Sequence, residues 1–495
     1  MTEEFKNLSI KLIEFEKLNT NSSSEYKRKV TDVLKQVVNE LKDEECRNAL
    51  ISDDISRLCK LLQAFIPVPL ESSSALPDDR DINLCTECVR CLRNACVQNE
   101  QNQNWIGQSG AVGNIKDLIA GVCSSESQES ISVLIRCAVQ LAGNLVSGNT
   151  NTRTLLWREL FPQSFLSVFN YEDTKASTYC CMLLHECLDD ELHLQQLIKQ
   201  PEGQQIIEAV LRLCEEEMQH DFSLQIMQKL VTTSEFMLSA YDNLPVPAKL
   251  TVLDILAAVI SQADGPSSAS NSPTVPMGEE GCKNNVGVPV FTIAYLAEQF
   301  EDLAKGAMAL ITEEQSRHST QQMIPVLTLR LLKVLGIAAS NHEVYKPLQD
   351  RESLLQTTLE LLERANLSGS SKQVPSTLHM NHEETSPVYG LKRDLVRLIG
   401  NMCYKHKPNQ HKVRELQGIP LILEHCKIHD QNPFISQWAI LTIRNLCADN
   451  QENQAFIAGM TTQGAAPSTD FLREMGVEVE MRDGIPYVKT TAKKK

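Results

Sequence analysis

The chain has 495 residues, of which 42% are hydrophobic and 5% aromatic, and its formal net charge is −16. This length suits two or three globular domains or one long solenoid, and the low aromatic content favours stacked helices over sheets and barrels. An acidic surface argues against nucleic-acid binding, because contacts with phosphates require clustered Lys and Arg.

Neither a membrane span nor a secretory signal is expected. No apolar run approaches the roughly 18 residues that a membrane helix requires, and the start, MTEEFKNLSIKLIEF, is too acidic and polar for a signal peptide. The 16 cysteines are then expected to be free thiols that act as small buried hydrophobic groups in a reducing compartment. These features predict a soluble cytoplasmic protein with no membrane insertion.

Residues 1–82 are expected to form N-terminal helices. Residues 5–18 can form a short amphipathic helix, and Ser22 and Glu25 have the spacing of a capping box at the start of the next helix. Apolar residues then recur at helical spacing.

A repeat begins in the following segment, 83–260. Asn94 is followed eight residues later by Asn102-Gln103, and a second copy carries Asn144, with Asn151 one position early and no Gln after it. These two copies predict armadillo-like repeats.

The same pattern returns near the other end of the chain, in 390–460. Asn401 is followed eight residues later by Asn409-Gln410, and Asn445 is followed eight residues later by Asn453-Gln454. The two anchors are 44 residues apart, and repeats of roughly 40–47 residues with two or three helices are typical of HEAT and armadillo solenoids.

Between these copies the pattern weakens. Residues 290–365 are expected to form degenerate repeats, in which 330–344 align with 397–413 and Val334 replaces the Asn. Two segments poor in large apolar residues, 261–289 and 366–389, are expected to be disordered loops.

Residues 461–495 are expected to form a terminal cap with a basic tail. Val477–Met481 alternates like a strand, Asp483-Gly484 is typical of a hairpin turn, and the following residues can return. The predicted fold is therefore an all-α armadillo or HEAT-like solenoid with a small C-terminal β-hairpin.

Four cysteines in the spacing C-x2-C-x2-C-x4-C, at 85, 88, 91 and 96, resemble an iron–sulfur or zinc site. No Gly or Pro lies between them to build a metal-binding loop, and their spacing suits one broad face of a helix. We expect packing and no metal. The sequence also lacks a P-loop, a dinucleotide-binding glycine motif, a nucleophile elbow and a zinc-protease motif, so no cofactor and no enzyme activity are expected.

The strongest candidate for function is the asparagine ladder, which consists of Asn94, Asn144, Asn401 and Asn445. An Asn amide offers donors and an acceptor and can clamp the backbone of an extended peptide. Alternatively, it bonds the neighbouring repeat and only holds the stack together. Residues one turn or one position before the ladder can line the same wall. The candidate partner-binding groove is therefore Arg90, Arg93, Asn94, Gln140, Asn144, Arg397, Asn401, Arg444 and Asn445.

A nuclear-transport receptor of the importin-α type is the alternative function. Such receptors place Trp four residues before the ladder Asn, to sandwich the stems of Lys side chains. Here those four positions hold Arg90, Gln140, Arg397 and Leu441, and Trp438 is seven residues before Asn445. An Arg there would repel a basic peptide, which argues against this alternative.

Several motifs together resemble the ataxin-10 family of armadillo proteins. They are CLRNAC at 91–96, RLIGNMCYK at 397–405, GIPLILEHC at 418–426, NPFISQWAI at 432–440 and IRNL at 443–446. The resemblance implies a non-enzymatic scaffold or adaptor that acts in cytokinesis, in processes linked to the centrosome and cilium, and in neuron survival and neurite outgrowth.

The same resemblance implies partners and places. The partners are O-GlcNAc transferase, a G-protein β subunit, mitotic kinases and further copies of the chain. The places are the perinuclear cytoplasm, the centrosome or ciliary basal body, and the midbody. Ser272 and Ser386, each followed by Pro in a predicted loop, are candidate phosphorylation sites.

Overall fold

A computed structural model describes residues 24–66, 79–123, 128–216, 221–263, 287–312, 319–370, 390–426, 433–460, 477–482 and 485–490 of the chain. Contacts divide the chain into two compact units, Met1–Tyr295 and Leu296–Lys495. Each unit is described by itself below.

The first unit is helical throughout its described residues. Its elements are α2 (Ser24–Glu40), α3 (Glu44–Asn48), α4 (Ser52–Phe65), α5 (Asp79–Ala95), α6 (Glu100–Gln108), α7 (Ala111–Val122), α8 (Glu129–Val146), α9 (Thr150–Leu160), α10 (Gln163–Asn170), α11 (Thr174–Cys187), α12 (Glu191–Lys199), α13 (Pro201–Glu216), α14 (Asp221–Val231), α15 (Ser234–Ser239), the short 3₁₀ helix η1 (Tyr241–Asn243) and α16 (Val246–Ala263).

Local sequence explains where these helices begin. Asn99, Asn149, Asp173 and Asp190 each precede a helix, and their side chains accept a hydrogen bond from a backbone N–H of its first turn. Such caps satisfy N–H groups that have no partner within the helix. At these four helices, the polar residue that precedes the helix therefore sets its start.

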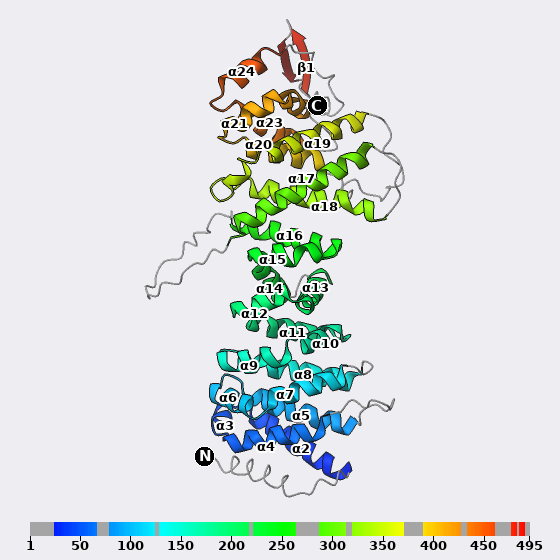
Figure 1. The fold of residues 1–495 in the computed structure, drawn as a ribbon, viewed down its shortest axis with the longest axis vertical. Helices are drawn as coiled ribbons and strands as arrows, with labels where there is room; N and C mark the ends of the chain where they lie inside the picture. Colours follow the sequence, from blue (N-terminus) through cyan, green and yellow to red (C-terminus); the bar gives the residue numbers. More distant parts are fainter. Residues whose placement is uncertain are drawn as a thin grey trace, which may run out of the picture. The chain divides into compact units, whose positions relative to one another are not determined.

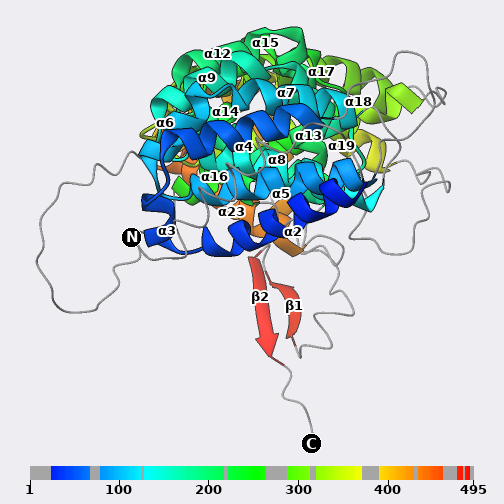
Figure 2. The same ribbon diagram turned by 90° about the horizontal axis from the view of Figure 1, so that it is seen from below.

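The helices of the first unit are stacked in rows. Helices α2, α5, α8, α11, α14 and α16 follow one another, each in contact with the next, and Figure 1 shows the layers that they form. Figure 2 shows α2 and α5 side by side. Helices α4, α7, α10 and α13 form a second row, and α6 contacts α9 in a third. Three helices per layer confirm the predicted helical-repeat solenoid.

The second unit continues the same construction. Helix α17 (Val290–Thr312) crosses the boundary between the units, and the elements after it are α18 (Ser319–Ala338), η2 (Lys346–Leu348), α19 (Glu352–Ser370), α20 (Leu391–Met402), α21 (Lys407–Glu415), α22 (Gly418–Leu423), η5 (Glu424–Cys426), α23 (Pro433–Cys447) and α24 (Gln451–Ala458). Helices α18, α20 and α23 pack in that order, and α21 contacts α24.

Two strands follow the helices. Strands β1 (Val477–Arg482) and β2 (Ile485–Thr490) pair antiparallel, with Val479 opposite Val488. The predicted turn at Asp483-Gly484 lies outside the described residues.

The helices extend into both segments that were predicted to be loops. Residues 261–263 complete α16 and 366–370 complete α19. At the end of α16, Ser261 Oγ donates to the carbonyl of Ala257, a bond that keeps a polar residue inside a helix. The predicted loop boundaries were therefore a few residues too early.

One described helix, α8, is long and apolar enough to cross a membrane by length and composition alone, with a mean hydropathy of 1.2 over 18 residues. Of that window, 61% is buried inside the structure, where α8 packs between α5 and α11. A core helix of a soluble repeat passes the same test, so α8 is accounted for by its packing.

The close approach of α20 and α23 depends on Gly400. A Cβ at this position would press against Oγ1 of Thr442 and lie 3.3 Å from its Cα. Thr442 cannot move away easily, because its Oγ1 donates to the carbonyl of Val396 at 3.0 Å.

We predict that Gly400→Ala lowers the free energy of unfolding by about 1–3 kcal/mol, the usual cost of overpacking. The matched control is Gly143→Ala in α8, where a Cβ meets nothing within 4 Å and helix propensity favours Ala by up to about 1 kcal/mol. Urea unfolding of both variants checks this, and equal effects of the two changes would contradict it.

Candidate protein-interaction surface

Each side-chain amide of the asparagine ladder donates to a backbone carbonyl of the preceding helix in its row. The distances are 2.9–3.1 Å in four pairs: Asn94 to Val38, Asn144 to Arg93, Asn401 to Gly336 and Asn445 to Gly400. The bonded carbonyls lie near helix ends, where carbonyls lack partners within the helix. The ladder thus joins neighbouring repeats, the role that the sequence left open as the alternative to clamping a peptide.

A second row of amides explains why Asn-Gln follows each ladder residue. Nδ2 of Asn102 donates to the carbonyl of Ala95, directly after the ladder residue, and to Arg47 O of the preceding repeat, both at 2.9 Å. Nε2 of Gln103 donates forward, to Asn144 O at 2.8 Å and Ser147 O at 3.1 Å. The Asn therefore bonds backward along the stack and the Gln bonds forward.

The last repeats show the same arrangement. Asn409 bonds Met402 O and Gln349 O, both at 2.8 Å, and Gln410 bonds Asn445 O at 2.9 Å. Asn453 bonds Leu446 O at 2.8 Å and Gln410 O at 3.1 Å.

Gln349 belongs to this second row of amides, although the sequence pattern did not predict it. Its Nε2 donates to Asn401 O at 3.2 Å and to Tyr404 O at 3.0 Å, as Gln103 does in the first unit. The residue before it is Leu348 and not Asn, so the Asn-Gln pair that would have revealed it is absent.

The predicted alignment of Val334 with Asn401 was wrong by three residues. Asn401 donates to Gly336 O as Asn445 donates to Gly400 O, so Gly336 corresponds to Gly400 and Ile337 to Asn401. Three residues are nearly one helical turn, and a Leu-rich pattern matches almost as well after such a shift.

In the first unit, two of the predicted wall residues join α5 to α8. Nη1 of Arg93 donates to Oε1 of Gln140 at 2.6 Å, and its Nε and Nη2 lie 3.3 and 3.2 Å from Oδ1 of Asn94. Arg90 instead pairs with Glu87 of its own helix, Nη1 to Oε1, at 2.7 Å. The structure therefore brings Arg93, Gln140 and Asn144 together, whereas Arg90 pairs with Glu87 and does not line the same groove.

In the second unit, Arg397 lies over the indole ring of Trp438, with its guanidinium carbon 5.0 Å from the ring centroid. Burial lowers the pKa of this guanidinium from its usual value, and its Nε is buried without a hydrogen-bond partner among the described residues. Arg444 is exposed on α23.

The ladder is interrupted at α11. Nδ1 of the buried His193 donates to Cys187 O at 2.9 Å, as Asn102 donates to the carbonyl that follows Asn94. Cys187 therefore corresponds to Ala95, and Glu186 holds the ladder position. A carboxylate has no proton to donate to a carbonyl, so Gly143 O receives no ladder bond from α11.

The other end of the α8–α11 interface is held by ionic and polar bonds. Nη2 of Arg136 lies 2.5 Å from Oδ2 of Asp173, and its Nε lies 3.0 Å from the same oxygen. The hydroxyl of Tyr171 lies 3.3 Å from Oγ of Ser132. These contacts hold the start of α11 against α8.

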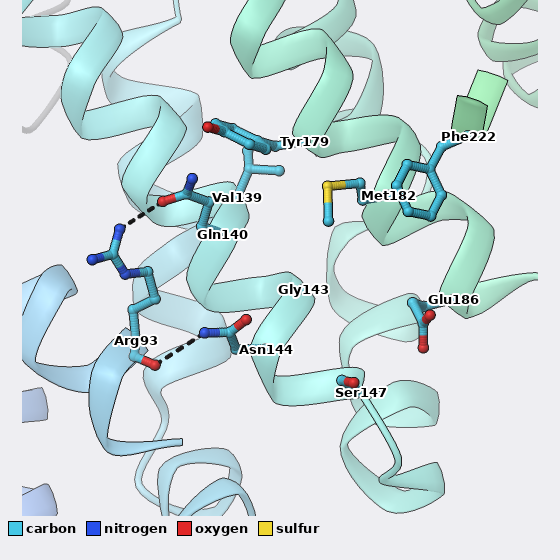
Figure 3. A pocket seen from close by; sticks show the side chains of 10 residues that line it. All are labelled: Arg93, Val139, Gln140, Gly143, Asn144, Ser147, Tyr179, Met182, Glu186 and Phe222. Atoms are coloured by element: carbon cyan, nitrogen blue, oxygen red, sulfur yellow. Dashed lines mark hydrogen bonds between the residues drawn. The ribbon is translucent and has the colours of Figure 1, made fainter. Parts of the chain in front are cut away.

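A groove of about 380 Å³ lies where the ladder is interrupted. We call it the α8–α11 groove, and Figure 3 shows the side chains that line it: Arg93, Val139, Gln140, Gly143, Asn144, Ser147, Tyr179, Met182, Glu186 and Phe222. Its volume is within the range of roughly 300–1,000 Å³ typical of binding sites. Tyr179, Glu186 and Phe222 are half-buried, and Met182 is 39% exposed.

Three of the predicted wall residues, Arg93, Gln140 and Asn144, line this groove. Tyr179, Met182, Glu186 and Phe222 were not predicted. They lie on α11 and α14, where the sequence has no Asn to mark the repeat.

The candidate phosphorylation sites Ser272 and Ser386 lie outside the described residues.

The four clustered cysteines face the core. Cys85, Cys88 and Cys91 are fully buried in α5, and Cys96 is fully buried directly after it. Cys85 Sγ donates to Phe65 O at 2.9 Å. Burial raises the pKa of the Cys96 thiol to about 12 and that of Cys88 well above its usual value. Among the described residues, no group of His, Cys, Asp or Glu is arranged to hold a metal ion.

We predict that Cys88→Ala lowers the free energy of unfolding by about 1 kcal/mol, because it removes one small buried group. Urea unfolding measures the cost, and elemental analysis of the purified protein measures its metal content. Stoichiometric zinc or iron that disappears in the variant would overturn the packing interpretation.

We predict that Asn445→Ala lowers the free energy of unfolding by about 1–3 kcal/mol, since it leaves the Gly400 carbonyl without this donor. The matched control is the exposed Asn83→Ala in α5, which should be neutral or slightly stabilising. Thermal melting of both proteins checks this; an unchanged melting temperature for Asn445→Ala would show that the ladder bond adds nothing to the stack.

Comparisons with known proteins agree with this architecture. Residues 391–489 match the family described as "Spinocerebellar ataxia type 10 protein domain", and residues 8–264 match the "BEM4 N-terminal domain". Ataxin-10 of Bos taurus is 33% identical over 83% of this chain and 83% of its own length. The Xenopus tropicalis protein is 32% identical over 90% of this chain and 87% of its own, and the Homo sapiens protein is 34% identical over 83% and 82%. The chain therefore belongs to the ataxin-10 family.

Proposed function

We propose that this chain is a non-enzymatic scaffold that binds segments of partner proteins along its stacked helices. The proposal rests on the α8–α11 groove. Both apolar and polar residues line it, and they come from four successive helices of one row. Binding sites combine these two features, because apolar contacts supply affinity and a few polar groups fix orientation.

Polar atoms in the groove suit an extended backbone. Oε1 of Gln140 accepts from Arg93 and Nδ2 of Asn144 donates to Arg93 O. The Gln140 amide nitrogen and the Asn144 amide oxygen remain on the groove side of these bonds. One donor and one acceptor on adjacent turns of a helix can bond the C=O and N–H of a peptide.

Membership of the ataxin-10 family extends the proposal to cellular roles. We propose action in cytokinesis, in processes linked to the centrosome and cilium, and in neuron survival and neurite outgrowth. The proposed partners are O-GlcNAc transferase, a G-protein β subunit, mitotic kinases and further copies of the chain. The proposed locations are the perinuclear cytoplasm, the centrosome or ciliary basal body, and the midbody.

The alternative of an importin-α type receptor is less well supported. Its mechanism needs a free Trp face for a Lys stem, whereas the guanidinium of Arg397 lies over one face of the Trp438 ring. A basic peptide would have to displace a like charge from the ring.

Proximity labelling tests the scaffold proposal directly. The full chain, fused to a labelling enzyme, is expressed in dividing cells, and its labelled neighbours are compared with those of a groove variant. A scaffold should label a defined set of proteins at midbody or centrosome. Labelling that matches the free enzyme would contradict the proposal.

We predict that Met182→Arg removes at least nine-tenths of the groove-dependent labelling, because the long side chain of the new residue fills the site and excludes a partner segment. The matched control is Leu192→Arg, a change at a 70%-exposed residue of α12 that does not line the groove. Circular dichroism confirms that both variants stay folded. Equal labelling by the two variants would place the binding surface elsewhere.

A further inference from the structure

Glu186 holds an unusual place in the groove. It occupies the ladder position of α11, yet no hydrogen bond or ion pair is found for its carboxylate among the described residues. It is half-buried and lines the groove with Gly143 and Ser147. A partly buried carboxylate without a cation favours a positively charged ligand group.

The apolar side chains beside Glu186 suit the stem of a long basic residue. Met182 and Tyr179 lie on the same helix at i−4 and i−7, and all three line the groove (Figure 3). Phe222 completes this wall from α14, and its ring makes an edge contact with His185, with centroids 5.6 Å apart. Aromatic and Met side chains pack against methylene groups, and an aromatic face attracts a guanidinium or ammonium group.

The positive charge on the opposite wall does not neutralise Glu186. The Arg93 guanidinium is held by Gln140 and Asn94 at distances from 2.6 to 3.3 Å, so it stays on the α5 side. Lys229 is paired with Asp189, the acidic residue nearest to Glu186 in the sequence, at 3.0 Å. The chain as a whole carries a net charge of −16, which favours the approach of a basic segment.

We propose that the α8–α11 groove binds an Arg or Lys side chain of an extended partner segment, with the charged end at Glu186 and the stem against Met182, Tyr179 and Phe222. This inference rests on the proposed scaffold function and names the chemistry of the partner at this site. The groove lies where the ladder is interrupted, since Glu186 holds the position from which an Asn would donate to Gly143 O.

The probes are three libraries of fluorescent nine-residue peptides that differ only in the fixed central residue: Arg, Gln or Glu. Binding to the full-length chain is measured by fluorescence polarisation. The wild type should bind the Arg library about tenfold more tightly than the Gln library, the factor expected for one charge-assisted hydrogen bond.

Three variants assign this preference to one carboxylate. Glu186→Gln should abolish the preference for Arg, and Glu186→Lys should shift the preference to the Glu library. The matched control Glu172→Gln makes the same charge change at an exposed residue outside the groove, and it should keep the wild-type preference. Circular dichroism and melting temperature establish folding, and Glu186→Gln decides the result if Glu186→Lys does not fold.

An unchanged Arg preference in Glu186→Gln, or an equal loss of that preference in Glu172→Gln, would overturn the inference. If tight Arg binding appears only after the Lys493–Lys495 tail is deleted, or changes with protein concentration, the occupant is the chain itself and a separate partner is ruled out. If no peptide library binds but Met182→Arg still abolishes the labelling, the groove does not bind a basic residue. The proposed scaffold function then stands. Loss of specific labelling by the wild type overturns the scaffold function itself.

Discussion

Stacked helices bury the carbonyl groups at their ends, and those groups must find donors that water cannot supply. This constraint is met in the same way in the described repeats at both ends of the chain. Asn side chains at the ladder positions and Asn-Gln pairs eight residues later provide the donors. The ladder Asn and the Asn of each pair bond backward, and the Gln bonds forward. Because each donor reaches only the adjacent layer, the spacing of these residues sets the register of the stack, and apolar packing fills the space between.

The same constraint bears on how the α8–α11 groove arises. At Gly400 the next helix approaches so closely that Thr442 would touch a Cβ, whereas at Gly143 the equivalent space is open. Glu186, which cannot donate to a carbonyl as an Asn would, lines that open space together with Gly143. The groove thus lies where a ladder position holds a residue other than Asn. Positions that break a local sequence pattern are where functional sites are expected.

The sequence predicted the features that recur in each repeat, but it did not predict the features that occur only once. The ladder, the helix rows and the burial of Cys88 follow from spacing alone, because identical packing demands identical residues. Gln349 was invisible without an Asn before it, and the register of Val334 was ambiguous by one turn. Glu186 could not be identified, since an acid on a helix usually faces solvent. Likewise, the contact of Arg397 with Trp438 joins residues 41 apart on two helices, which only the fold brings together.

The bonds between α8 and α11 are unequally distributed along their length. Arg136 and Asp173 clamp one end with paired charges, while the ladder bond that fastens other layers is absent from the opposite end. The α8–α11 interface is therefore held by charge at its start, and at its other end it leaves a groove of about 380 Å³ lined by Glu186. One pair of helices thus combines a fixed end with an open one.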